Sequence, residues 1–225
     1  IFVDDENNVY LVDSSNSKVV IFSEYLQYKS TIQYFINEEG IRDSLSEPQG
    51  VFVTSEKIFI ADTNNNRIVV FDRSGKYLYQ LGEPESTVFP ADSIYKPIAI
   101  AVDNAERIYV VSSTTYMGVI VLDAAGTFQN FIGAQTVSVN RIDLIWRQFM
   151  TAKQRALTTK NISTEYNNIT IDENGFVYVT TSSIKESDQA TSISGSSTYS
   201  PVKKLNSSGE DVMTRNGFFG PVGEI

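Results

Sequence analysis

A short apolar strand recurs four times along the chain, and this repetition constrains the fold more than any other feature. The copies begin at Val9, Ile58, Ile108 and Val177, so two intervals are close to fifty residues and the last is about twenty longer. Repetition at such a period is typical of solenoids and propellers, in which each repeat is one small structural unit. The sequence therefore predicts an array of similar units with one large insertion.

Each copy contains the parts of a four-stranded meander. An alternating apolar run precedes the recurring strand, a polar turn separates the two, and a third and a fourth strand follow. This pattern is typical of β-hairpins. Because one sheet cannot bury both of its apolar faces alone, the units must stack, and four-stranded units of this length stack as propeller blades.

We therefore predict an all-β protein, a β-propeller of four-stranded antiparallel blades. Residues 1–225 are expected to be a single propeller domain or a fragment of one. The repeats are expected at about 1–47, 48–96, 97–166 and 167–220, with the start of a fifth at 220–225.

The stretch ADTNNNRIVVFDRSG shows how one unit turns. Residues 64–66 are three asparagines, placed where the second strand must turn back into the third. Asparagine tolerates left-handed backbone angles and its side chain caps turn amides. Arg67 then begins the third strand, and we expect its guanidinium to pair with a carboxylate of its own or a neighbouring blade.

Residues 47–82 resemble an NHL repeat, whose pattern runs from proline and glycine through an aspartate-asparagine-arginine turn to phenylalanine-aspartate and glycine. The other copies are degenerate. More narrowly, IYKPIAIAVD, DLIWRQFMTAKQR, TEYNNITID and NGFFGPVGEI resemble a Firmicutes group in which the propeller precedes a multi-helix membrane domain.

This resemblance implies a propeller of the six-bladed type, of which about four blades are present here. It also implies an extracytoplasmic location, at the cell surface or anchored to the membrane of a Gram-positive bacterium. The membrane would be reached only through regions outside this chain.

The amino-acid composition disfavours or excludes several classes of partner and of catalytic site. Eighteen basic against 27 acidic residues give a net charge of −9, which disfavours a nucleic-acid partner. The chain has no cysteine and no histidine, which removes thiolate metal sites, the commonest general base and every Ser-His or Cys-His arrangement. We expect no catalytic constellation and no resident metal or other cofactor, with calcium as the one ion considered.

The long connections indicate where binding occurs. The first-to-second and third-to-fourth turns are short, whereas insertions fall at residues 37–47, 82–96, 133–166 and 182–200. In a propeller meander these insertions project from one face. Because loops on a rigid scaffold commonly carry binding sites, we predict that this face binds a protein or a small polar or carbohydrate ligand.

The longest insertion contains apolar residues at helical spacing, so we expect a helix near 142–156. Its tryptophan lies beside an arginine, a pair that suits an anionic or carbohydrate ligand; alternatively, the tryptophan packs the helix onto the propeller.

Asn167 and Asn168 stand where we expect proline and glycine at the entrance of a first strand, and either bind a polar ligand or satisfy the backbone groups at the strand end. The candidate binding residues are Tyr95, Tyr116, Trp146, Arg147, Arg155, Asn167 and Asn168.

Three functions follow from these observations. The leading hypothesis is a non-enzymatic binding or scaffold propeller. The alternative is a calcium-dependent lactonase or esterase of the gluconolactonase type, since calcium needs no histidine; no set of carboxylates at successive strand ends is visible, however. RNA binding, as in animal NHL proteins, requires a basic face and is disfavoured by the acid excess.

Overall fold

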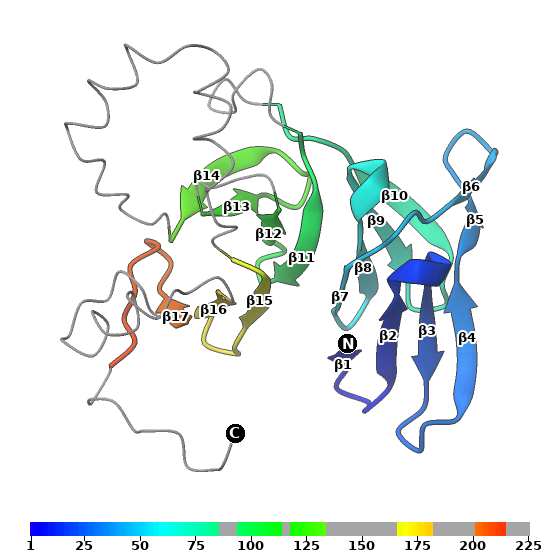
Figure 1. Ribbon diagram of the computed structural model, residues 1–225, viewed down its shortest axis with the longest axis horizontal. Coiled ribbons are helices and arrows are strands. Elements are labelled where there is room, and N and C mark those ends of the chain that lie inside the picture. The colour runs from blue at the N-terminus through cyan, green and yellow to red at the C-terminus, as the bar shows by residue number, and fades with distance from the viewer. Residues whose placement is uncertain (86–93, 114–117, 134–165, 182–200, 215–225) are drawn as a thin grey trace, which may run out of the picture.

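A computed structural model describes residues 1–85, 94–113, 118–133, 166–181 and 201–214, which form four small antiparallel sheets arranged as the blades of a β-propeller (Figure 1). Blade 1 contains β1 (Phe2–Val3), β2 (Val9–Asp13), β3 (Lys18–Phe22) and β4 (Tyr28–Ile32). Blade 2 contains β7 (Gly50–Val53), β8 (Lys57–Asp62), β9 (Arg67–Asp72) and β10 (Tyr77–Leu81). Blade 3 contains β11 (Pro97–Val102), β12 (Ile108–Ser112), β13 (Val119–Leu122) and β14 (Phe128–Ile132). Blade 4 contains β15 (Asn168–Ile171), β16 (Val177–Thr180) and β17 (Val202–Leu205).

The predicted meander is confirmed, because neighbouring strands in each blade are consecutive in the chain. The first strands lie side by side: β7 contacts both β1 and β11, and β11 contacts β15. In blade 4 the backbone after β17 adds a partial fourth strand, since Asp211 bridges to Leu205 and the Val212 amide donates to the Lys204 carbonyl. The helix predicted near 142–156 and the fifth-blade start at 220–225 lie outside the described residues.

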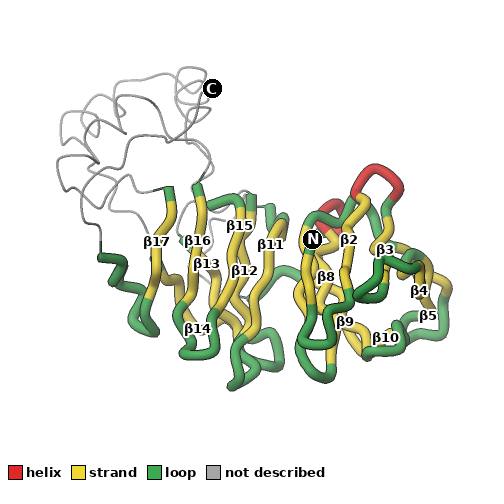
Figure 2. The backbone as a smooth tube through the Cα atoms, turned by 90° about the horizontal axis from the view of Figure 1, so that it is seen from below, coloured by secondary structure: helices red, strands yellow, loops and turns green. Residues whose placement is uncertain are grey.

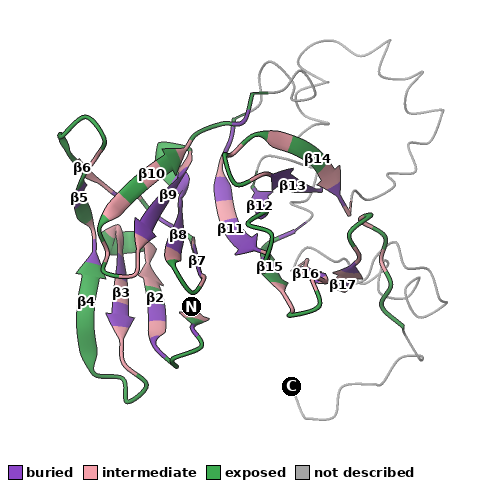
Figure 3. Ribbon diagram, turned by 180° about the vertical axis from the view of Figure 1, so that it is seen from behind, coloured by how far each residue is buried: buried purple, intermediate pink, exposed green. Residues whose placement is uncertain are grey.

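The core lies between the blades. Apolar side chains of blade 1 pack on one face of blade 2, and the opposite face of blade 2 packs, together with blades 3 and 4, in a second cluster. Phe2 of β1 and Phe52 of β7 meet between blades 1 and 2 with ring centroids 4.9 Å apart. The middle blades are consequently buried on both sides, while β4 is largely exposed (Figure 3). Successive side chains of a strand point to opposite faces of the sheet, so each strand of a middle blade supplies side chains to the interfaces with both neighbouring blades.

A hairpin that we did not predict joins blades 1 and 2. It consists of β5 (Tyr34–Ile36) and β6 (Arg42–Ser44), with Phe35 paired to Asp43. Instead of projecting as a loop, the link packs across the outer strands of blade 2: the Phe35 ring stacks on Tyr77 at 5.3 Å and meets Phe71 edge-on at 5.1 Å. The alternating apolar run before the NEEG turn was the sequence signal for it.

The tight turns share one arrangement, in which an aspartate side chain accepts hydrogen bonds from backbone N–H groups of the turn. Asp72 and Asp123 each begin a third-to-fourth turn and accept hydrogen bonds from the backbone N–H groups two and four residues later. The third residue after each aspartate is a glycine with positive φ, Gly75 and Gly126. Aspartate caps such turns and glycine adopts left-handed angles at little cost. Asp4, Asp103 and Asp172 close the first-to-second turns in the same way.

Candidate functional site

Two faces of the propeller differ in construction (Figure 2). The link face carries the short 3-10 helices η1 (Ser14–Asn16) and η2 (Thr63–Asn65) and the chain segments that enter blades 2, 3 and 4. The opposite turn face carries the first-to-second and third-to-fourth turns. The described part of the predicted binding surface is therefore the link face around η2 and the entrances of blades 3 and 4.

The three asparagines have separate roles on the link face. Asn66 adopts the left-handed conformation (φ 54°) after η2, as expected for asparagine at this point. Asn65 donates its amide to Asp62 at 2.8 Å and to the Ser44 carbonyl at 3.1 Å. Asn64 is exposed, and its side-chain oxygen lies 3.5 Å from the Lys96 ammonium at the entrance of blade 3. One turn of blade 2 thus contacts both the segment that ends at Ser44, before the blade, and the entrance of blade 3.

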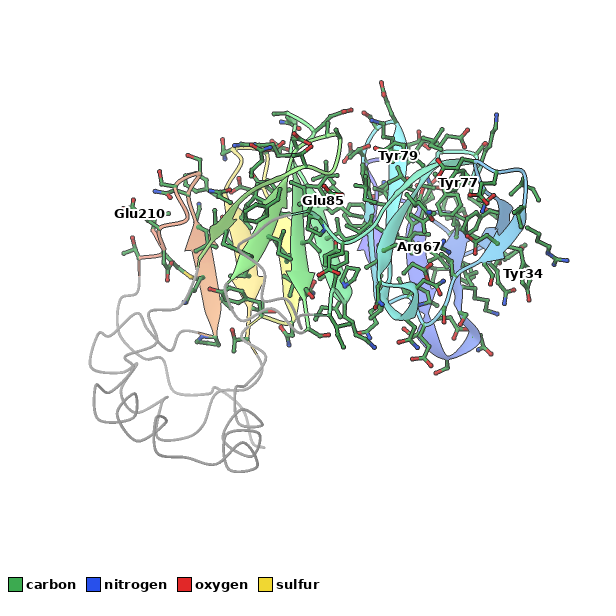
Figure 4. All side chains as sticks on the ribbon, turned by 90° about the horizontal axis from the view of Figure 1, so that it is seen from above. Tyr34, Arg67, Tyr77, Tyr79, Glu85 and Glu210 are labelled. Atoms are coloured by element: carbon green, nitrogen blue, oxygen red, sulfur yellow. The ribbon has the colours of Figure 1, made fainter. Side chains whose placement is uncertain are left out.

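Arg67 is the central cation of this region. Its Nε donates to Asp62 at 2.8 Å and its terminal nitrogens donate to both oxygens of Asp43, at 2.7 and 3.1 Å. Burial lowers the pKa of Arg67, but the hydrogen bonds to Asp43 and Asp62 outweigh it and leave the pKa raised. The expected pairing is confirmed, with one carboxylate from its own blade and one from the hairpin. Figure 4 shows Arg67 and Tyr77 on the outer strands of blade 2 and Tyr34 at the rim of the molecule.

Hydroxyl groups of the 3-10 helices hold the following blade. Ser14 Oγ donates to the Pro48 carbonyl at 2.5 Å, and Thr63 Oγ1 donates to the Pro97 carbonyl at 2.7 Å. Each proline lies just before or at the start of the next first strand and supplies only an acceptor. This repeated contact was missed from the sequence, although a hydroxyl at the start of each 3-10 helix was its visible signal.

Tyr95 is not a surface group, contrary to its choice as a binding candidate. Its side chain is buried in the cluster shared by blades 2, 3 and 4, and burial raises the pKa of its hydroxyl. Among the described residues this hydroxyl has no hydrogen-bond partner. Asn66, with its amide oriented to donate, reaches the Tyr95 carbonyl at 2.9 Å.

Asn167 and Asn168 are exposed at the entrance of blade 4, as expected for a surface site. Asn168 takes the glycine position as expected, because it pairs with Thr180 as Gly50 pairs with Ala61. Asn167 takes the place of Gln49, since its N–H donates to the Thr180 carbonyl as that of Gln49 donates to Ala61, and Tyr166 occupies the proline position. The side-chain oxygen of Asn167 accepts from the Thr180 hydroxyl at 2.6 Å.

Asn168 takes the place of Gly50, where a Cβ would approach the Ile98 carbonyl to 2.6 Å. Blade 2 therefore requires glycine at this position, whereas blade 4 accommodates an asparagine. The remaining candidates, Tyr116, Trp146, Arg147 and Arg155, lie outside the described residues.

The aspartates that close the first-to-second turns are engaged in internal hydrogen bonds. Asp4, whose side chain is almost fully buried, accepts from Asn8, from the Tyr10 hydroxyl at 3.1 Å and from Arg73 of blade 2. Burial alone would raise the pKa of Asp4, but these hydrogen bonds lower it to about 2. The same pairing of a turn aspartate with a tyrosine hydroxyl recurs as Asp103–Tyr109 and Asp172–Tyr178, at 3.1 and 3.0 Å. These carboxylates stabilise turns and are not displayed for a ligand.

Within the described residues, no three metal-ligating side chains come together. None of the described helices is long and apolar enough to cross a bilayer.

Two families match segments of the chain. Residues 45–71 match the NHL repeat and residues 155–184 match a beta-propeller repeat. The first covers η2, Asp62 and Arg67, whereas Asp43, the second carboxylate of the ion-pair network, lies just before it. Together with the four sheets, these matches define the class of the protein as a β-propeller, one segment of which matches the NHL repeat.

Individual relatives cover only parts of the chain or are only distantly similar. Protein brain tumor of Drosophila melanogaster is 44% identical over 48 residues, which are 20% of this chain and 5% of that protein. A virginiamycin B lyase from Staphylococcus aureus has a TM-score of 0.49 at 13% identity, covering 96% of this chain and 55% of its own. A glutaminyl cyclase from Myxococcus xanthus has a TM-score of 0.48 at 16% identity, covering 79% and 65%. The chain thus spans a small fraction of its curated relative and less than two thirds of these structures.

Proposed function

We propose that this chain is a non-enzymatic binding or scaffold propeller that takes its ligand on the link face. One observation carries the proposal. Turn-face carboxylates such as Asp4 are used in closing turns, whereas Asn64, beside Lys96, and Asn167, at the entrance of blade 4, present exposed amides on the link face. Amides and an ammonium group recognise hydroxyl, carbonyl and carboxylate groups, so the ligand is a protein or a small polar or carbohydrate molecule.

The NHL-type fold supports this function, because a rigid propeller holds such groups on one surface without requiring any to react. The absence of histidine and cysteine from the sequence agrees with a binding role.

We further propose an extracytoplasmic location, at the surface or membrane of a Gram-positive bacterium. Protease treatment of intact cells, followed by immunoblotting for the propeller, tests that location; protection from protease in intact cells but not in lysed cells contradicts it.

The test of the function is a ligand screen of the intact protein by differential scanning fluorimetry, using a panel of mono- and oligosaccharides and of acidic peptides. We expect hits whose thermal shift disappears in the double variant Asn64→Ala/Asn167→Ala. The matched control is Glu173→Ala at the exposed tip of a blade 4 turn, which should leave the shift unchanged. Hits that survive the double variant, or turnover of a lactone or ester at an enzymatic rate, would contradict the proposal.

The calcium-dependent hydrolase is the competing function and has a direct test. Calorimetric titration with calcium alone should give no saturable heat if the chain is a binding propeller. Stoichiometric calcium binding together with lactone hydrolysis would replace the binding function by the enzymatic one.

A further inference from the structure

The third-to-fourth turn of blade 1 departs from its counterparts in the other blades. In blades 2, 3 and 4 the four turn residues are DRSG, DAAG and NSSG, whereas blade 1 has SEYL at residues 23–26. The backbone is the same in each case. Ser23 Oγ accepts from the N–H groups of Tyr25 and Gln27, just as Asp72 accepts from the residues two and four positions later. Only the side chains at the tip differ.

Leu26 occupies the left-handed position of this turn, with φ 57°, where the other blades have glycine. A γ-branched side chain is disfavoured there because its Cβ crowds the following carbonyl oxygen. Leu26 gains no burial in exchange, since 68% of its surface is exposed. A strained and exposed leucine stabilises neither the turn nor the core.

Two aromatic residues accompany the leucine. Tyr25 is 77% exposed and Tyr28, which begins β4, is 65% exposed. Tyr25 and Leu26 lie in the turn and Tyr28 begins the strand that follows it, so three exposed apolar side chains stand within four residues of one another; we define Tyr25, Leu26 and Tyr28 as the apolar tip. Exposed aromatic and aliphatic groups gathered on a rigid turn are typical of protein-binding surfaces, in which tyrosine is enriched.

The surroundings of the apolar tip are acidic. Glu24 lies within the turn, and the exposed Asp5 and Glu6 lie in the adjacent first-to-second turn of the same face. Lys29 connects the two turns by donating to Asn8 at 2.8 Å, and Asn8 donates in turn to Glu6 at 3.2 Å. This charge repels anionic lipid, and it also repels a second copy of the same tip.

We propose that the apolar tip is a second docking surface, distinct from the link face, and that its partner is a protein with an apolar groove rimmed by basic residues. The leucine and tyrosines enter the groove, and Glu24 with its acidic neighbours pairs with the rim. Two docking surfaces on opposite faces allow the propeller to bridge two partners.

The variant Tyr25→Ser/Leu26→Gly tests this proposal, because it gives the tip the last two residues of the blade 4 turn and should fold. The probe is a synthetic two-helix peptide in which leucines line the groove between the helices and lysines border it, titrated by fluorescence anisotropy. We expect the wild-type chain to bind it at least tenfold more tightly than the double variant, with affinity falling as salt is raised. The control Ile36→Thr removes a comparably exposed apolar side chain from the β5–β6 hairpin and should bind like wild type.

Equal affinities of wild type and double variant would overturn the proposal, as would binding to phosphatidylcholine vesicles in place of the peptide.

The melting temperature of the single variant Leu26→Gly provides a second measurement. We expect its melting temperature to equal or exceed that of wild type, because glycine relieves the left-handed strain. A lower melting temperature would show that Leu26 maintains the fold and would also overturn the proposal.

Discussion

Blades 1 and 2 share a strand pattern but not an environment. In blade 2 the second strand is buried on both sides, whereas in blade 1 the same strand has one covered and one open side. Ile60 and Leu11 occupy equivalent positions, since each is the third residue of its recurring strand, yet Ile60 is fully buried and 37% of Leu11 is exposed. The stability that a repeat contributes therefore depends on its neighbours, as expected for stacked units.

The largest expected effect tests that contrast directly. Ile60→Ala should lower the free energy of unfolding by about 4 kcal/mol, because it removes a fully buried side chain and leaves a cavity. Leu11→Ala should cost only about 1 kcal/mol, because water already contacts the leucine. Urea denaturation of both variants measures the difference. Equal costs would mean that the open side of blade 1 is covered in solution.

The second contrast concerns ion pairs at equivalent turns. Arg67→Ala should cost about 3 kcal/mol, since it leaves the buried Asp62 and the partly buried Asp43 without their cation. Lys18, at the matching position of blade 1, lies 3.7 Å from Asp13 in a longer and more solvent-exposed pair, so Lys18→Ala should cost less than about 0.5 kcal/mol.

Denaturation in low and high salt separates the two cases, because only the exposed pair is strongly screened. A salt-sensitive loss at Arg67 would contradict the buried network.

Much of this fold was predictable from the sequence, because the interactions that specify the strands and turns act between residues close together in the chain. Strand alternation and turn residues such as Asp72 and Gly75 act over a few positions and specified the meander, the blades and the role of Arg67. The β5–β6 hairpin was not predicted, because its stability comes from Phe35 stacking on Tyr77 more than forty residues away. Similarly, Tyr95 was placed on the surface because sequence position alone does not show that three blades close over it. The predicted sites at Trp146 and Arg147 stay predictions.

A third prediction uses the turn face. The folded-state pKa of Asp4 is about 2, below its ordinary value of 3.8. A depressed carboxyl pKa contributes stability above the unfolded-state value and loses it as pH falls through the folded-state value. Between about pH 4 and pH 2 the chain should therefore lose about 2 kcal/mol through this group.

The free energy of unfolding of wild type and Asp4→Asn, measured across this range, tests the assignment. The variant should show a shallower acid limb, and parallel curves would assign the loss to other carboxylates.

The smallest expected effect concerns two buried tyrosines. The Tyr10 hydroxyl donates to Asp4, whereas the Tyr95 hydroxyl has no partner among the described residues. Burying an unpaired hydroxyl is unfavourable, so Tyr95→Phe should raise the free energy of unfolding by about 1 kcal/mol, while Tyr10→Phe should lower it by a similar amount.

Opposite signs for chemically identical substitutions would confirm that pairing, and not burial, decides the contribution of each hydroxyl. If Tyr95→Phe instead lowers stability and also removes the thermal shift caused by a link-face ligand, the hydroxyl takes part in binding. That result would restore Tyr95 to the candidate site from which its burial removes it.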